Sequence, residues 1–157
     1  RSTPLYSSAA SDVFKRQDLR YANLTHTNLE ETDLSGANLG GVNLSESNLT
    51  GAFLKKADLR WSVLLGVAAV GSDFSDTGLL ESRLSFSNFT NADFSGSDLR
   101  RSDLTDAIFV STNFSQANLA RVDLSNAEIS GADFNGANTH GLKLPDGFSK
   151  CLDGKNG

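Results

Sequence analysis

The side chains that could carry out chemistry are scattered along this chain. The two histidines, His26 and His140, stand far apart in the sequence, which argues against a shared metal ion or proton relay. The single cysteine, Cys151, permits neither an internal disulfide nor a cysteine-based zinc site, and we interpret it as an incidental thiol in the tail. The pair Gly40-Gly41 lacks the flanking residues of a phosphate-binding loop.

Serines and aspartates are numerous, but they recur at regular positions instead of forming a constellation. No serine sits in the strand-turn-helix context that activates a nucleophile. The aspartates are expected on the outside of a convex surface, whereas enzyme chemistry needs a concave site. We therefore expect no enzymatic activity, no cofactor and no metal ion.

The composition is that of a single acidic, folded domain. Of the 157 residues 38% are hydrophobic and 21% charged, and the net charge is -5 with a pI of about 4.9. The longest apolar run covers residues 63–70, well short of the roughly 18 residues of a spanning helix. An acidic balance argues against direct nucleic-acid binding. The chain begins at Arg1 and contains no methionine, so we leave open that a segment precedes it.

The elements that position these side chains follow from a repeat of five residues. Its centre, position i, is an apolar residue, and 27 centres follow one another from Phe14 to Leu144 without an insertion; 24 of them are Leu or Phe. Position i−2 is Ala, Ser, Thr or Val from Ala22 to Ala137, and position i−1 is mostly Asp or Asn. Position i+2 holds nine of the 14 glycines.

A period of five fits neither a helix nor an open strand. Residues i−2 and i are two apart, so in an extended segment both point to the same side, which we assign to the core. The remaining three residues must turn the chain through a corner, and Asn, Asp, Ser and Gly suit tight turns. The phenylalanines at 74, 94, 114 and 134 are spaced by 20 residues, which suggests four pentapeptides in each coil.

Several of these pentapeptides resemble the A(D/N)LXX signature of the pentapeptide-repeat family, for example Ala22-Asn23-Leu24 and Ala132-Asp133-Phe134. The resemblance implies an all-β fold, a right-handed quadrilateral β-helix of about six to seven coils. We expect an extension or cap at residues 1–11, the β-helix at residues 12–144 and a tail or cap at residues 145–157. The family implies no single activity, since its members include DNA-mimicking gyrase-binding proteins, thylakoid-lumen proteins and cyanobacterial regulators.

Function must then lie at the outward positions i−1, i+1 and i+2. Two adjacent sides of the coil are rich in acidic residues at i−1, and the candidate acidic face comprises Asp33, Asp58, Asp73, Asp93, Asp98 and Asp133. One hypothesis is that these carboxylates mimic DNA. The other is that Asp and Asn at i−1 bond to backbone amides of the turns, and nearby arginines dilute any phosphate-like pattern.

Apolar residues interrupt the polar outward positions in the middle of the chain. The candidate interface comprises Phe53, Trp61, Val63, Leu65, Val70, Phe86, Ile108 and Val110. Contiguous exposed apolar residues often mark a binding surface, and aromatic side chains are favoured anchors, although single exposed apolar residues need no explanation.

These observations favour a non-catalytic scaffold that binds a protein partner, as a monomer or weak homodimer, without direct contact to nucleic acid or membrane. The alternative is a DNA mimic that binds DNA gyrase or another topoisomerase through its acidic faces. Acceptor sequences for N-glycosylation recur throughout the repeat, for example at Asn23 and Asn88. Their number favours a bacterial cytoplasm or a plastid compartment such as the thylakoid lumen over secretion through the ER.

Overall fold

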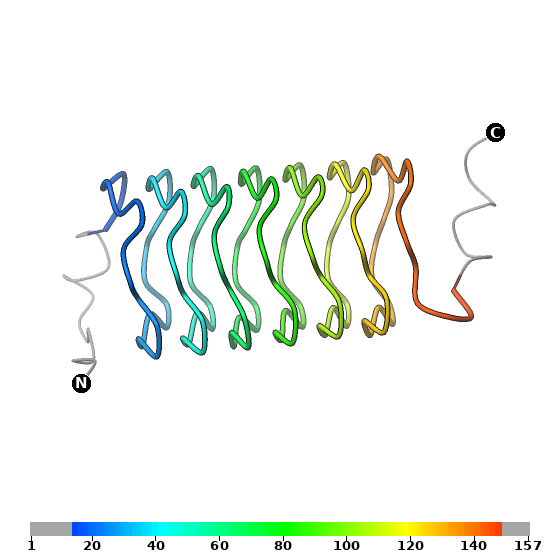
Figure 1. Ribbon diagram of the computed structural model, residues 1–157, viewed down its shortest axis with the longest axis horizontal. Helices are drawn as coiled ribbons and strands as arrows, with labels where there is room; N and C mark the ends of the chain where they lie inside the picture. The colour runs from blue at the N-terminus through cyan, green and yellow to red at the C-terminus, as the bar shows by residue number, and fades with distance from the viewer. Residues whose placement is uncertain (1–13, 149–157) are drawn as a thin grey trace.

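A computed structural model describes residues 14–148 of the chain. The backbone winds into a rod of stacked coils, whose colour in Figure 1 runs from blue at the N-terminal end to red at the C-terminal end. The described residues contain no helix, and the chain pairs with itself through short parallel bridges between residues 20 apart, from Asp18 with Asn38 to Asp123 with Lys143. Each coil is therefore four pentapeptides long, as predicted, and the fold is the predicted right-handed quadrilateral β-helix.

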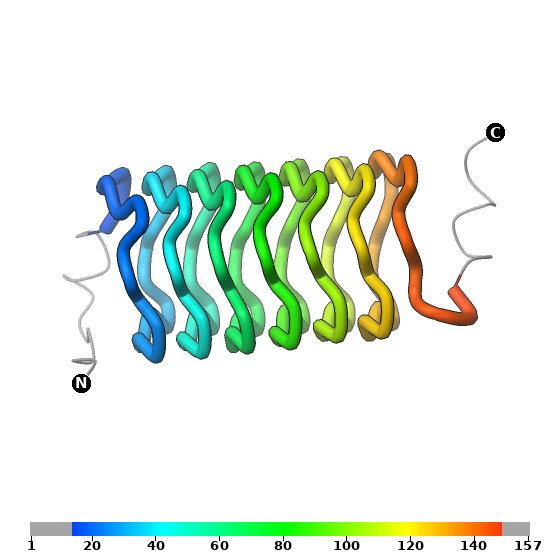
Figure 2. The backbone as a smooth tube through the Cα atoms, viewed as in Figure 1, coloured from blue at the N-terminus to red at the C-terminus, as the bar shows by residue number. Residues whose placement is uncertain are grey.

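Each pentapeptide bonds to the next coil through its backbone. On one side, Leu34 N–H donates to Phe53 O at 2.7 Å, Phe53 N–H donates back to Thr32 O at 3.0 Å, and Gly36 N–H donates to Lys55 O at 2.9 Å. The pattern repeats along the rod, so adjacent coils lie side by side over their whole length (Figure 2). Such a ladder satisfies the buried backbone groups without long strands.

The corners are β-turns with a left-handed third residue. The N–H of Ala37 donates to Leu34 O at 3.0 Å across one such turn, and position i+2 has φ between 54° and 70° in every pentapeptide from Arg16 to Gly141. A positive φ at the third position is the mark of a type II turn, and glycine adopts it without a steric penalty. Where the residue is not glycine, its side chain projects outward from a corner.

For reference, the four sides are numbered by consecutive pentapeptides of one coil: side 1 contains Phe74, side 2 Leu79, side 3 Leu84 and side 4 Phe89. Side 1 is opposite side 3, and side 2 is opposite side 4. The central residues of all four sides are buried from Leu29 to Ile129 and form one continuous core, against which the central residues of the end coils are partly buried.

From Phe74 onward, phenylalanine replaces leucine at most central positions of sides 1 and 4, whereas sides 2 and 3 keep leucine as far as Leu124. Phe74 stacks on Phe94 with ring centroids 4.8 Å apart, and the same column continues with Phe114 and Phe134. A second column on side 4 stacks Phe89 on Phe109 at 5.3 Å. The 20-residue spacing of these aromatics thus reflects direct stacking between coils.

Most hydroxyl groups at i−2 bond to the turns that they face. The Oγ of Ser72 donates to Ala69 O at 2.6 Å, and the Oγ of Ser82 donates to Leu79 O at 2.6 Å. The side chain of Ser87 bonds to a corner of the preceding coil, because its Oγ donates to Leu64 O and accepts from Val67 N–H. Within residues 14–148, the buried Oγ atoms of Ser47 and Ser62 have no hydrogen-bond partner.

The ends of the predicted domains fall mostly outside the described residues. The proposed cap at residues 1–11 lies entirely outside them, as does the larger part of the tail at 145–157. The described part of that tail forms a turn, in which Phe148 N–H donates to Pro145 O at 3.2 Å, and Phe148 packs against the core.

Candidate functional site

Every residue of the candidate acidic face is part of a turn. In each case one carboxylate oxygen accepts a hydrogen bond from the backbone N–H two residues later. The distance is 2.8 Å from Asp73 to Ser75 and 3.3 Å from Asp98 to Arg100, and Asp33, Asp58, Asp93 and Asp133 make the same bond. Asn113 makes it as well, to Ser115, so the bond needs an oxygen and not a charge.

Three of these carboxylates also form ion pairs. Asp58 accepts from Arg60 Nε at 2.8 Å and Nη2 at 2.6 Å, and Asp98 pairs with Arg100 in the same bidentate geometry. These hydrogen bonds from arginine lower the pKa of Asp58 and Asp98 below its usual range. Asp33 lies 3.0 Å from Lys15 Nζ.

The remaining acidic candidates form a single column. Asp73, Asp93 and Asp133 lie on side 1 and pair with no Lys or Arg among residues 14–148. Asp33 is in the same column, whereas Asp58 and Asp98 are on side 2. The structure therefore divides the candidate acidic face into two parts. On side 2 both carboxylates are neutralised by arginine, whereas on side 1 only Asp33 is paired with a cation.

Seven of the eight candidate interface residues lie on adjoining sides. Trp61 projects from the corner between sides 2 and 3, Val63 and Leu65 lie on side 3, and Phe86 projects from the corner between sides 3 and 4. Val70, Ile108 and Val110 lie on side 4. Phe53 is separated from them, because it lies on side 1, opposite side 3.

Five of the seven are close neighbours, and we call them the apolar band: Trp61, Val63, Leu65, Val70 and Phe86. The first four lie along one coil, and residues 61–72 contain no charged side chain. Phe86 projects from the next coil beside Gly66 and is 68% exposed, and Trp61 is 51% exposed. Ile108 and Val110 lie two coils from Ala68 and Val70, with Asn88 and Thr90 between them.

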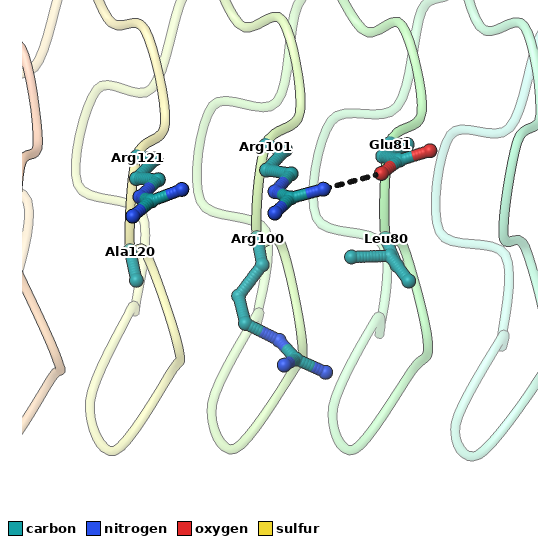
Figure 3. Close-up of a pocket in the computed structure, with 6 residues that line it drawn as sticks. All are labelled: Leu80, Glu81, Arg100, Arg101, Ala120 and Arg121. Carbon is teal, nitrogen blue, oxygen red and sulfur yellow. Dashed lines mark hydrogen bonds and ion pairs between the residues drawn. The ribbon is translucent and has the colours of Figure 1, made fainter.

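The sequence interpretation missed two features of side 2. Tyr21 is 78% exposed, and its ring lies over Gly41, where a Cβ would be only 2.6 Å from the ring carbons. A surface depression lies further along the same side, lined by Leu80, Glu81, Arg100, Arg101, Ala120 and Arg121 (Figure 3). The 20-residue spacing of Arg101 and Arg121 is the sequence signal that indicates it.

Residues 14–148 contain no cluster of three or more His, Cys, Asp or Glu side chains able to hold a metal ion. None of their segments forms a helix long and apolar enough to cross a membrane. His26 contacts Glu46, which lies at the same corner in the next coil, and its Nδ1 is 3.2 Å from Glu46 Oε2. His140 is on side 2, near the C-terminal end of the described residues.

Solved structures of pentapeptide-repeat proteins resemble the rod. HetL from Nostoc sp. strain PCC 7120, described as involved in heterocyst differentiation regulation, is 20% identical with a TM-score of 0.46, covering 89% of this chain and 94% of its own. QnrB1, a plasmid-mediated fluoroquinolone resistance protein, is 16% identical with a TM-score of 0.37, covering 86% and 84%. A thylakoid-lumen protein from Arabidopsis thaliana is 19% identical with a TM-score of 0.28, covering 90% and 71%.

Among curated protein sequences, no relative matches this chain. The family model for pentapeptide repeats does match, with eight copies over residues 13–36, 27–66, 70–106 and 107–138. These segments account for most of the sequence. The structure agrees with this match, because its bridges between residues 20 apart make each coil four pentapeptides long. The chain therefore belongs to the pentapeptide-repeat family.

Proposed function

We propose that this protein is a non-catalytic scaffold that binds another protein through the apolar band. The observation that carries the proposal is the uncharged stretch of residues 61–72, which crosses sides 3 and 4 on one coil of an otherwise polar rod. Trp61 and Phe86 stand at the two corners that flank Val63 and Leu65, so two large aromatic side chains border a half-buried aliphatic surface.

The physical argument rests on shape and on desolvation. The backbone ladder holds the band on a stiff surface, so a partner need not order it on binding. Aromatic anchors contribute much of the free energy of typical interfaces, and burial of apolar area contributes about 25 cal/mol per Å² before the costs of association. Arg60 lies over the ring of Trp61, with its Cζ 5.1 Å from the ring centroid, at the edge of the band.

A photo-crosslinking experiment tests the proposal with two matched positions. Phe86 and Phe53 are both exposed phenylalanines, but only Phe86 belongs to the apolar band. Each is replaced in turn by p-benzoylphenylalanine, and the protein is irradiated in an extract of its source cells and also alone at rising concentration. We expect a discrete cross-linked species from position 86 and none from position 53.

A second pair of variants separates the band from general effects on the surface. Leu65→Asp introduces a charge into the band, and Thr105→Asp introduces the same charge in the same column two coils away. We expect the cross-link from position 86 to disappear with Leu65→Asp and to persist with Thr105→Asp. Equal cross-linking from positions 53 and 86, or persistence in Leu65→Asp, would refute the proposal.

The alternative function, a DNA mimic that binds DNA gyrase, receives less support from the charges. Asp33, Asp58 and Asp98 are each paired with a cation, so the members of the candidate acidic face without such a pair among residues 14–148 are Asp73, Asp93 and Asp133, in one column on side 1. Mimicry of a phosphate backbone needs a dense and continuous row of negative charge. For the compartment, we keep the bacterial cytoplasm or a plastid compartment as the proposal, since acceptor asparagines such as Asn23 and Asn88 lie at outward positions.

A further inference from the structure

Arginines gather on side 2 and at its corner with side 3. The described residues contain seven arginines, and five of them are here: Arg20, Arg60, Arg100, Arg101 and Arg121. The acidic residues of this surface are Asp18, Asp58, Asp98 and Glu81, one fewer than the arginines. The whole chain has a net charge of -5, so the surface stands out against the rest of the molecule.

Three of the five arginines are fully engaged with aspartate. Arg20, Arg60 and Arg100 each form a bidentate pair with the aspartate two residues earlier, with Nη2–Oδ2 distances of 2.8, 2.6 and 2.7 Å. Bidentate pairs fix both partners and leave the guanidinium little capacity for a further anion. The available positive charge therefore belongs to Arg101 and Arg121.

These two arginines occupy the same corner column on adjacent coils. Figure 3 shows Glu81, Arg101 and Arg121 in line, with the side chains of both arginines extending toward the coil of Glu81. Arg101 Nη1 is 3.2 Å from Glu81 Oε1, whereas no carboxylate among residues 14–148 lies within ion-pair distance of Arg121. The backbones of Arg101 and Arg121 thus lie at the roughly 4.8 Å spacing of neighbouring strands, and only Arg101 contacts a carboxylate, that of Glu81. A second carboxylate between the two guanidinium groups would relieve their repulsion.

The surroundings of the two guanidinium groups give the site an apolar floor. Leu80 and Ala120 lie in the neighbouring i+1 column, on either side of Arg100, and line the same depression. The existing Arg101–Glu81 pair is open to solvent, with 60% and 42% of the two side chains exposed. Exposed pairs of this kind contribute little to stability, so an incoming carboxylate can exchange with Glu81 at small cost.

We propose that this depression is a binding site for an acidic segment of another protein. A Glu or Asp carboxylate of the segment bridges Arg101 and Arg121, and an adjoining apolar side chain covers Leu80 and Ala120. A nucleic acid fits less well, because a phosphate backbone needs several cations, whereas this surface has one in excess and the molecule as a whole is acidic. Of the apolar band, Trp61 lies beside Glu81 in the same corner column, whereas Val63 and Leu65 lie on side 3 and Phe86 at its far corner. The two proposals are tested by different variants, Leu65→Asp for the band and Arg121→Gln for this site, so either can fail without the other.

The test uses a fluorescein-labelled peptide that alternates glutamate and leucine over eight residues, titrated with the whole protein and followed by fluorescence anisotropy. We expect saturable binding that weakens as sodium chloride rises from 50 to 500 mM, because the contacting charges are exposed. We expect Arg101→Gln and Arg121→Gln each to weaken binding about three- to fivefold. Arg83→Gln, which removes the same charge from side 3, should change it by less than about twofold.

Removal of an acidic side chain from the site should change the affinity for the peptide in the opposite direction. Glu81→Gln releases Arg101 and should strengthen peptide binding about three- to fivefold, whereas Asp106→Asn makes the same change in net charge on another corner and should leave it unaltered. Absence of binding at millimolar protein overturns the proposal. So does an equal response to Arg83→Gln and Arg121→Gln, or tighter binding of a labelled single-stranded oligonucleotide than of the peptide.

Discussion

The stacked phenylalanines on side 1 allow a direct measurement of what one coil contributes to the next. Phe94 is fully buried between Phe74 and Phe114, with ring centroids at 4.8 and 5.4 Å, and it meets Phe89 and Phe109 at an angle. Replacing it by leucine, the usual residue at this position, keeps most of the apolar area but removes the ring contacts. The variant therefore isolates the aromatic contribution.

The expected magnitude follows from those contacts. Aromatic pairs contribute about 0.5–1.5 kcal/mol each beyond the area they bury, and four pairs that share one ring do not add fully. We expect Phe94→Leu to lower the free energy of unfolding by about 2–4 kcal/mol. Phe134→Leu should lower it by about 1 kcal/mol, because the ring of Phe134 stacks on Phe114 alone and is partly exposed.

A double-mutant cycle makes the test independent of cavity effects. Urea unfolding followed by circular dichroism gives the free energies for Phe74→Leu, Phe94→Leu and the double variant, and we expect a coupling of about 0.5–1.5 kcal/mol. The control cycle joins Phe74 and Phe134, which lie three coils apart in the same column and have no ring partner in common, and should give a coupling below about 0.3 kcal/mol. Equal couplings in the two cycles would refute the idea that direct ring stacking stabilises the rod.

Three other predictions concern single residues. Ser62→Ala should raise the free energy of unfolding by about 1 kcal/mol in urea, because a buried hydroxyl without a partner is removed, whereas Ser82→Ala should lower it; a loss of stability in both would contradict this. The pKa of Asp123 falls from 3.8 to about 2 through its hydrogen bonds with Ser125 and Lys143, so its contribution to stability is complete above pH 4 and disappears as the pH falls toward 2. Asp123→Asn should accordingly have a lower melting temperature than the parent protein at pH 6 and nearly the same one at pH 2. A difference in melting temperature that persists at pH 2 would argue against a stabilising role of the ionised carboxylate. In a gyrase supercoiling assay, with and without a quinolone, we expect no effect of the protein at any ratio; inhibition or protection that Asp73→Lys weakens would instead favour the DNA mimic.

The sequence was sufficient to predict the fold because each residue of a pentapeptide has one fixed role. The register from Phe14 to Leu144 identified the inward pairs. The spacing of the phenylalanines only suggested four sides, and the resemblance to the pentapeptide-repeat family supplied the four-sided, right-handed coil. What it could not give was the detail of individual corners. The insertion of Ser87 Oγ between Leu64 O and Val67 N–H depends on the local path of the backbone, and no pattern of residue types encodes it.

The candidate sites were predictable in position but not in chemistry. Folding the sequence at 20 residues per coil correctly brought Val63 and Leu65 to one side, and it placed the acidic residues in columns. It did not reveal that Asp58 and Asp98 are neutralised within their own pentapeptides, because that depends on the rotamers of Arg60 and Arg100. Whether a column carries net charge is thus decided by side-chain geometry and not by composition.

The bridging of residues 20 apart determines how the length of this protein can change. Loss of one complete coil would shorten the rod by one strand spacing and leave all later side chains on their original sides. Loss of a single pentapeptide would preserve the buried pattern but rotate everything after it by one quarter of the perimeter. If the lost pentapeptide lay between Trp61 and Arg101, the surface that carries Arg101 and Arg121 would no longer be aligned with the one that carries Trp61. Natural or engineered variation in multiples of 20 residues can therefore extend a shared binding surface, whereas variation in fives redistributes it around the axis.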